Sequence, residues 1–294
     1  GYDDESNGSA VSGYVVREKC DFPSNFRCEG TIEDFLKKHG IVGIYDIDTR
    51  RLTRIIRETG VMNGMITTEE FVMEEALEKI KGFKAERPVP KVSCKESVKF
   101  EAENKKFSVV LMDYGCKHNI RKELVNRGCD VTVMPWNSTA EEVCALNPDG
   151  IMLSNGPGDP TDNPEAIETL KKLSEKNIPT FGICLGHQLY ALANGASTVK
   201  LKYGHRGENQ PVTDLELGRT FITSQNHGYA VLNDSISENV GKVSHVNAND
   251  GTCEGVRYTN SPAFTVQFHP EACGGPQDTA YLFDEFIKLM EERK

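Results

Sequence analysis

The sequence has no apolar run long enough to cross a membrane and no excess of positive charge. Of its 294 residues, 38% are hydrophobic and 27% are charged. A helical membrane span would need about 20 consecutive apolar residues. The 34 lysines and arginines are outnumbered by 44 aspartates and glutamates, which gives a formal net charge of -10. Because such a chain repels phosphate backbones, we expect neither nucleic acid nor a membrane as its partner.

The nine cysteines are odd in number and include no C-x-x-C pair. This pattern argues against a disulfide framework and against a zinc knuckle, and it indicates a reducing, cytoplasmic compartment. The sequence also lacks a P-loop and a G-x-G-x-x-G motif, so we expect no nucleotide site in this chain. Its first residues, GYDDESNGSAV, show neither an initiator methionine nor a signal peptide.

A charge-rich stretch over residues 81–106 contains two prolines and has no sustained apolar period, which is typical of a linker. The sequence therefore predicts two domains, 1–104 and 105–294. In the first domain, TIEDFLKKHG (31–40) begins with a threonine cap and predicts a short helix. The segment DTRRLTRIIRETG (48–60) predicts another.

In the second domain, apolar runs alternate with helical periods. Runs such as FSVVLMD (107–113) and PTFGI (179–183) are each followed closely by a helical pattern. This alternation predicts parallel strands with crossover helices, hence a doubly wound α/β fold. Beyond residue 197 the chain is rich in strand patterns such as AFTVQF (263–268), and it closes with a helix over 278–292. We therefore expect a mixed, mostly parallel sheet.

Cys184 lies between two glycines in GICLG, where an apolar run gives way to a helical one. The pattern has the G-x-nucleophile-x-G layout of a nucleophile elbow. A helix N-terminus at such a turn favours the thiolate and can lower a cysteine pKa from about 8.5 into the range of roughly 3.5 to 7.5. Free cysteines are also among the most buried residues. The pentapeptide alone therefore leaves open whether Cys184 reacts or only packs.

The loop SNGPGDP (154–160) closes the preceding apolar run. It could be an ordinary tight turn. Ligands of open α/β sheets, however, bind at the carboxyl ends of the strands, where this loop and Cys184 are both expected. We therefore favour an oxyanion hole in which the loop gives one backbone N–H and Leu185 gives the other.

His269, in QFHPEA, is the strongest candidate for a proton carrier. Pro270 favours an extended backbone, so His269 and Glu271 can project to the same side, where the carboxylate can orient the ring. The rival is His187, three residues after Cys184, but it has no neighbouring carboxylate and we expect it to be packed. The segment QNHGYAV (225–231) by itself indicates a turn.

A metal site is the remaining chemical alternative, and its possible ligands are His205, His227, His245 and His269. Their spacing includes no helical i, i+4 pair, and no cysteine set accompanies them. We therefore predict that the chain has no metal site.

The motifs FGICLGHQ, SNGPGDP, QNHG and FHPEA, spread over residues 107–290, together resemble the class I (triad) glutamine amidotransferase family. The resemblance implies that Cys184 attacks the side-chain amide of glutamine to form a glutamyl thioester, with His269 as base and acid and Glu271 as its orienter. Tyr229 stands where many members carry phenylalanine. The remaining site residues that the resemblance implies are Gly156 and Leu185 for the oxyanion hole, and Gly158, Gln188, Asn226, Gly228 and Tyr229 for glutamine.

Three further segments, IVGIYDIDTRRLTRIIRETGVMNGMI, KYGHRGENQPV and NANDGTCEG, resemble the small, glutamine-hydrolysing chains of carbamoyl phosphate synthetases. This implies that the partner is a large synthetase subunit, which takes up the ammonia and uses ATP, Mg²⁺ and bicarbonate in a pathway to arginine and pyrimidines. No cofactor is expected in this chain itself. Chains of this family begin several dozen residues before the equivalent of Gly1, so we expect the first domain to be incomplete and to lack a glutamine-binding serine.

Three alternatives stay open at this point. The chain could be the glutaminase subunit of another amidotransferase, of the anthranilate, aminodeoxychorismate or GMP synthase type. It could be a catalytically silent partner module that keeps the fold. It could also be a thiol hydrolase of a different amide. The retention of Cys184, His269 and Glu271 together disfavours the silent module.

Overall fold

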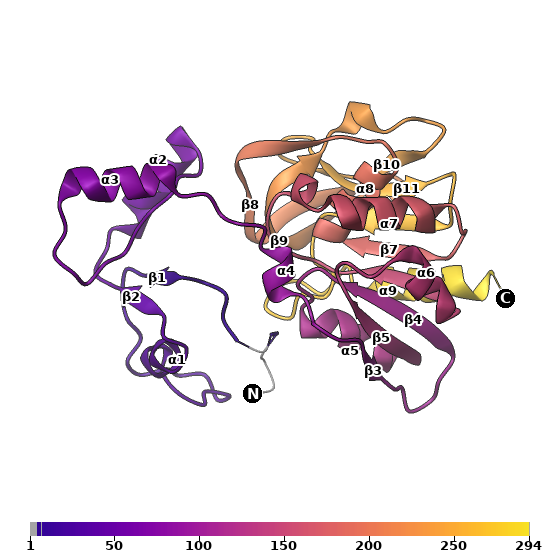
Figure 1. Cartoon of the computed structure of the whole chain (residues 1–294), viewed down its shortest axis with the longest axis horizontal. Helices are drawn as coiled ribbons and strands as arrows, with labels where there is room; N and C mark the ends of the chain where they lie inside the picture. The colour runs from indigo at the N-terminus through magenta and orange to yellow at the C-terminus, as the bar shows by residue number, and fades with distance from the viewer. Residues whose placement is uncertain (1–4, 7, 294) are drawn as a thin grey trace. The chain divides into compact units, whose positions relative to one another are not determined.

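The computed structural model describes residues 5–6 and 8–293, and the chain divides into two compact units between Glu86 and Arg87 (Figure 1). In the first unit, strands β1 and β2 pair in parallel, and three helices accompany them. The bounds of these elements are β1 (Gly13–Val15), α1 (Ile32–Lys38), β2 (Val42–Ile44), α2 (Thr49–Thr59) and α3 (Met73–Gly82).

The first two helices of this unit begin where the sequence predicts. Thr31 caps α1 by accepting a hydrogen bond from the Asp34 N–H, and the Asp34 carboxylate accepts one from the Thr31 N–H. The Asp48 side chain caps α2 by accepting a hydrogen bond from the Arg51 N–H. Within the described part of this unit, however, only Gly60 and Ala76 are buried. Its described apolar side chains therefore form no hydrophobic core of their own.

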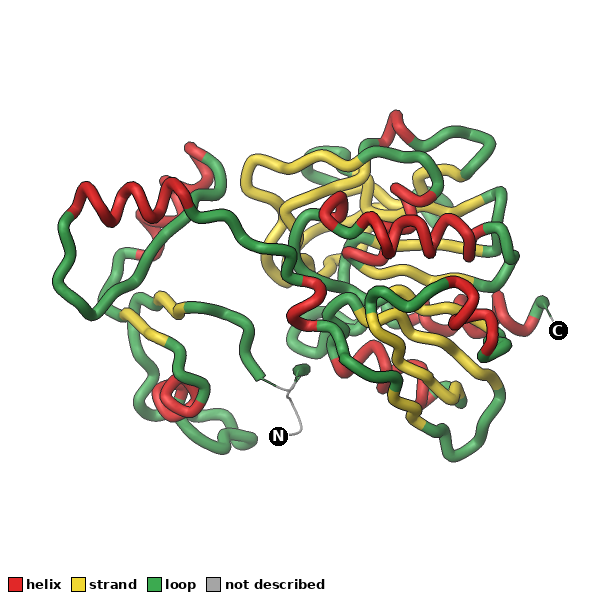
Figure 2. Tube along the Cα trace, in the orientation of Figure 1, coloured by secondary structure: helices red, strands yellow, loops and turns green. Residues whose placement is uncertain are grey.

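The second unit is built on one mixed sheet, which has ten strands within the described residues (Figure 2). Their spatial order is β3-β5-β4-β6-β7-β12-β11-β10-β8-β9. The strands are β3 (Val98–Phe100), β4 (Phe107–Asp113), β5 (Cys129–Pro135), β6 (Gly150–Leu153), β7 (Thr180–Ile183), β8 (Thr198–Asp214), β9 (Arg219–Val231), β10 (Gly241–Asn247), β11 (Cys253–Tyr258) and β12 (Ala263–Val266).

Five neighbouring strands, β5, β4, β6, β7 and β12, run parallel, whereas β3 at one edge and the β11-β10-β8-β9 group at the other pair antiparallel. The predicted doubly wound α/β fold with a mixed sheet is confirmed. The helices and 3₁₀ turns of this unit are α4 (Val89–Val92), α5 (His118–Asn126), α6 (Ala140–Ala145), η1 (Pro160–Asp162), α7 (Pro164–Ser174), α8 (Leu185–Ala193), η2 (Asn233–Ser235) and α9 (Tyr281–Glu291).

Helices cover both faces of the sheet. On one face, Val143 of α6, Leu170 of α7 and Leu189 of α8 pack into one core cluster. On the other face, Ile120 of α5 and Phe283 of α9 belong to a second cluster. Because the central strands are buried on both sides, their sequences are continuous apolar runs and do not alternate between apolar and polar residues. Among the helices of the described residues, none is long and apolar enough to cross a membrane.

The stretch predicted as a linker, 81–106, contributes largely to the second unit. Val89 of α4 is fully buried, and β3 pairs with β5 as an edge strand. The Ser93 hydroxyl accepts a hydrogen bond from the Trp136 N–H. The division of the chain therefore falls between Glu86 and Arg87 and not near residue 104. Of the charged residues that suggested a linker, Lys99 lies in the edge strand β3, where charged side chains are common.

Candidate active site

Cys184 occupies a sharp turn between β7 and α8. Its φ of 53° and ψ of -102° lie in a backbone region that residues other than glycine rarely adopt. The Cys184 N–H donates to the Val266 carbonyl at 2.8 Å, and the residue is 4% exposed. The sequence therefore predicted the local backbone correctly, because the strained strand-to-helix turn is the defining feature of a nucleophile elbow.

The two glycines around Cys184 let strand and helix approach each other closely. A Cβ atom on Gly186 would lie 2.5 Å from the Leu153 carbonyl oxygen. One on Gly182 would lie 3.1 Å from the Gly186 carbonyl. Side chains at these positions would push α8 away from the sheet, so the cysteine would leave its place at the end of β7.

We expect the Gly186→Ala variant to be less stable than the parent chain by about 1–3 kcal/mol, because its methyl group meets main-chain atoms of β6. Denaturant unfolding would measure the change. Gly82→Ala is the matched control, since a Cβ there meets nothing within 4 Å. Equal stability of both variants would contradict the close contact between α8 and β6.

His269 and Glu271 converge on Cys184 from the segment that follows β12. The His269 Nδ1 atom lies 2.7 Å from the Glu271 Oε1 atom, and the ring also contacts the Cys184 side chain. His269 and Glu271 are 4% and 2% exposed. Because a carboxylate only accepts, Nδ1 carries the proton of this bond, which leaves Nε2 for the thiol. The structure thus brings together the three residues that the sequence nominated for catalysis.

The electrostatics of this group favour a charged imidazole. Burial acts to lower the pKa of His269, but the charges of Glu271 and Cys184 outweigh it and raise that pKa to about 9. Burial likewise acts to raise the pKa of Glu271, yet His269 and Lys117 lower it to about 2. Glu271 is therefore ionised across the physiological range, and His269 holds a proton beside the cysteine.

Lys117 is a member of the site that sequence reasoning missed. Its Nζ atom lies 3.1 Å from the Glu271 Oε1 atom and 3.3 Å from the His269 Nδ1 atom. Its position held a signal, because Lys117 follows β4, whose carboxyl end lies at the same sheet edge as Cys184. The lysine places a third charge beside the His269–Glu271 pair.

The SNGPGDP loop lies against the start of α8. A Cβ on Gly156 would be 2.7 Å from the Leu185 Cδ2 atom and 2.3 Å from the Tyr114 carbonyl oxygen. Gly158 has a φ of 96° and would bring a Cβ to 2.6 Å from Pro88. The two segments nominated for the oxyanion hole are therefore adjacent, and glycine is required at both positions of the loop.

Among the predicted glutamine-binding residues, Gln188 and Tyr229 are directly linked. The Gln188 Nε2 atom donates to the Tyr229 carbonyl at 2.8 Å, which joins α8 to β9. The Tyr229 hydroxyl lies against Asp159, and burial together with this carboxylate raises the pKa of Tyr229 to about 12. Gly228 precedes Tyr229 on β9. Asn226 is exposed on the same strand, and in the described part of the chain no hydrogen bond joins its side chain to the triad.

His187 has the packed position expected for it. The side chain is fully buried on α8, and its Nδ1 atom lies 2.8 Å from the Thr265 Oγ1 atom. Burial lowers the pKa of His187 to about 3, so the ring is neutral. His269 is therefore the histidine that the structure sets against Cys184.

The comparisons with known proteins agree with this geometry. Residues 110–289 match the family model of class-I glutamine amidotransferases. A Thermoplasma acidophilum protein whose description names it as part of a GMP synthase has a similar fold, with a TM-score of 0.56 over 65% of this chain and 97% of that one. At 23% identity, this likeness concerns the fold alone. The second unit is thus a glutamine amidotransferase domain of class I.

Nearly the whole chain is similar to one particular group within that class. Residues 1–66 match the small-chain domain of carbamoyl-phosphate synthase. The carbamoyl phosphate synthase small chain of Listeria monocytogenes (strain F2365) is 51% identical over 99% of this chain and 80% of its own length. That of Bacillus caldolyticus is 51% identical over 96% of this chain and 77% of its own length. The chain belongs to the carbamoyl phosphate synthase small-chain family.

This membership confirms the resemblance seen in the sequence and does not favour an anthranilate or GMP synthase component. The chain is a glutamine-hydrolysing subunit, and its family implies a large-subunit partner.

Proposed function

We propose that Cys184 hydrolyses glutamine through a covalent thioester and that the released ammonia is consumed by a large synthetase subunit. The observation that carries this proposal is the strained Cys184 in contact with His269, whose far ring nitrogen is bound by the buried Glu271 carboxylate. Nucleophile, base and orienter thus have separate positions and separate roles.

In the first half of the reaction, the Cys184 sulfur attacks the amide carbon of the glutamine side chain. The tetrahedral oxyanion is stabilised by the backbone N–H groups of Gly156 and Leu185. As the C–N bond breaks, His269 gives its proton to the leaving nitrogen, which departs as ammonia. In the second half, His269 takes a proton from water, the hydroxide attacks the thioester carbon, and glutamate leaves as the Cys184 thiolate returns.

Glutamine is held by the residues around this centre. Gln188 and Tyr229 are joined by the hydrogen bond from the Gln188 Nε2 atom to the Tyr229 carbonyl. Gly158 contributes exposed backbone. The full proposed glutamine-binding set is Gly158, Gln188, Asn226, Gly228 and Tyr229.

The large subunit binds the ATP, Mg²⁺ and bicarbonate of the complete reaction. The two chains form a heterodimer or a higher assembly of it, and the product enters arginine and pyrimidine synthesis. Support comes from the family of the chain and from its lack of any P-loop.

Chemical labelling tests the nucleophile directly. A chloroketone analogue of glutamine is expected to add once per chain, at Cys184, and free glutamine should prevent the addition. Cys20, Cys28 and Cys273 are exposed, whereas Cys184 is buried, so exposure alone would direct the reagent elsewhere. Iodoacetamide serves as the control that reports exposure. Peptide mass spectrometry showing the analogue on the exposed cysteines, and not on Cys184, would overturn the proposal.

A further inference from the structure

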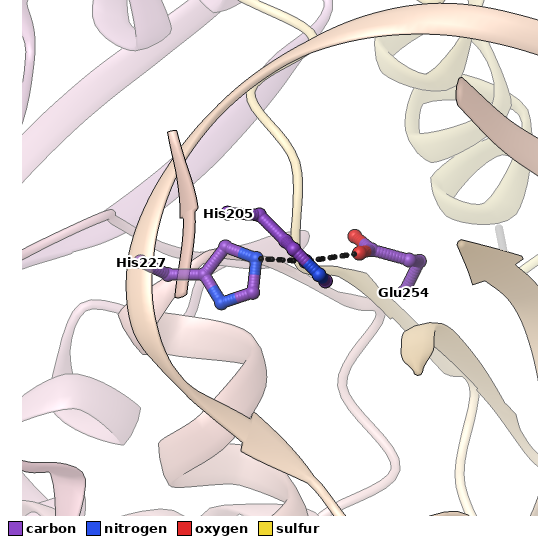
Figure 3. A group of neighbouring side chains, drawn as sticks. All are labelled: His205, His227 and Glu254. Atoms are coloured by element: carbon purple, nitrogen blue, oxygen red, sulfur yellow. Dashed lines mark hydrogen bonds and ion pairs between the residues drawn. The ribbon is translucent and has the colours of Figure 1, made fainter. Parts of the chain in front are cut away.

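Three buried side chains of types that can bind metals meet at residues 225–231 of β9, and the triad includes none of them. They are His205 of β8, His227 of β9 and Glu254 of β11 (Figure 3). The two histidines are direct partners in the β8–β9 register. The three side chains offer ligand atoms that all lie within 4.8 Å of one another. Glu254 is fully buried, and the histidines are 8% and 5% exposed.

The far nitrogen of each ring is occupied by an acceptor. The His205 Nε2 atom donates to the Asp250 Oδ2 atom at 2.9 Å, and the His227 Nδ1 atom donates to the Tyr229 carbonyl at 2.7 Å. Neither an ionised carboxylate nor a carbonyl can donate, so each far nitrogen carries the ring proton. In neutral rings, the two facing nitrogens, His205 Nδ1 and His227 Nε2, are then lone pairs 3.2 Å apart. Histidines that bind metals are held by such acceptors.

Further acceptors surround the same point. The Glu254 Oε1 atom lies 3.2 Å from the His205 Nδ1 atom, and the Gln225 Oε1 atom lies 3.0 Å from the His227 Nε2 atom. Among the described residues, no hydrogen bond reaches the buried Glu254 Oε2 atom. Lone pairs that face one another in a buried site are stabilised by a proton or a cation between them.

The geometry fits a metal ion as that charge. Ligands bound at 2.0–2.2 Å around a tetrahedral zinc ion are separated by about 3.3 Å, and two separations in this cluster are 3.2 Å. We propose that His205, His227 and Glu254 bind a divalent ion of the Zn²⁺ type. Asp250 and the Tyr229 carbonyl orient the two rings, and the Gln225 side-chain oxygen lies beside the fourth position.

The proposed site would link residues 225–231 of β9 to the neighbouring strands of the sheet. His227 lies between Asn226 and Gly228, and the Tyr229 carbonyl that holds its ring also accepts from Gln188. Metal binding would thus hold β9 against β8 and β11 without touching Cys184. Histidine spacing alone predicted no metal site, because the members of this cluster come from three separate strands and only the sheet register joins them.

Cobalt substitution tests the proposal on the full chain. After removal of metal with a chelator, Co²⁺ titration is expected to give the intense visible bands of a tetrahedral ion at one equivalent, without thiolate charge-transfer bands. Zn²⁺ should displace the cobalt and raise the midpoint of thermal unfolding. Glu254→Gln keeps the shape of the side chain but should weaken binding by about 100-fold or more, since it removes a ligand.

Two further variants separate a metal site from a structural network. Asp250→Asn keeps all three ligands and is expected to weaken Co²⁺ binding by about 10–100-fold. His245→Gln replaces a buried histidine of β10 outside the cluster and should bind Co²⁺ as the parent does. Absent tetrahedral bands in the folded chain, or undiminished binding by Glu254→Gln, would overturn the proposal. In either case the glutaminase proposal is unaffected.

Discussion

Replacing Cys184 with alanine is expected to lower glutamine-dependent carbamoyl phosphate synthesis by about 10³-fold or more in the complex with the large subunit. Synthesis from added ammonia should persist. The reason is that no thioester can form without the sulfur, whereas ammonia supplied from solution bypasses the glutaminase step. The measurement is the rate of carbamoyl phosphate formation with each nitrogen source, at matched ATP and bicarbonate.

Cys129→Ala is the matched control for this experiment. Cys129 is also buried and unpaired, but it begins β5 and packs in the core at the amino end of that strand, whereas Cys184 follows the carboxyl end of β7. Its loss should leave both activities close to those of the parent. Loss of both activities in Cys184→Ala, or of neither, would show that the cysteine is not the nucleophile of a separable glutaminase.

How much the sequence could predict depended on how local each feature is. The turn at Cys184 is determined by Gly182 and Gly186, because a Cβ at either position would strike main-chain atoms. Such constraints are visible in five consecutive residues. The pairing of His269 with Glu271 is equally local, since an extended backbone places residues two apart on the same side. These predictions needed no knowledge of the tertiary structure.

Features that depend on strand order were harder to predict from the sequence. Lys117 reaches Glu271 only because β4 and β12 end at the same edge of the sheet, with β6 and β7 between them. The His205–His227 contact depends on an irregular β8–β9 register, which shifts on both sides of this pair. The start of the second unit was misplaced for a related reason, because β3 looks like a linker until its pairing with β5 is known.

The first unit shows a further limit of the sequence. Its helix caps were predictable, yet its helices bury almost nothing in the described residues. An amphipathic helix predicts that an apolar face is covered but does not say by what.

Replacing Glu271 with glutamine is expected to lower kcat/KM for glutamine by about 10²–10⁴-fold, because the proposed orienter of His269 loses its charge. The amide can still meet the ring but stabilises the imidazolium poorly. Steady-state glutaminase kinetics would measure the loss. Glu271→Asp is the matched comparison, since it retains the charge and changes only the reach of the side chain.

The pH dependence gives this variant a signature that simple misfolding would not produce. In the proposed mechanism His269 must be protonated to release ammonia, so its pKa of about 9 is expected to place the alkaline limb of kcat/KM near pH 9 in the parent. The Glu271 charge is the largest of the influences that raise this pKa. In Glu271→Gln the limb should move toward lower pH, so the ratio of parent to variant activity grows as the pH rises toward 9. Glu271→Asp should keep its limb closer to that of the parent, and an unmoved limb in Glu271→Gln would show that the carboxylate does not control the His269 proton.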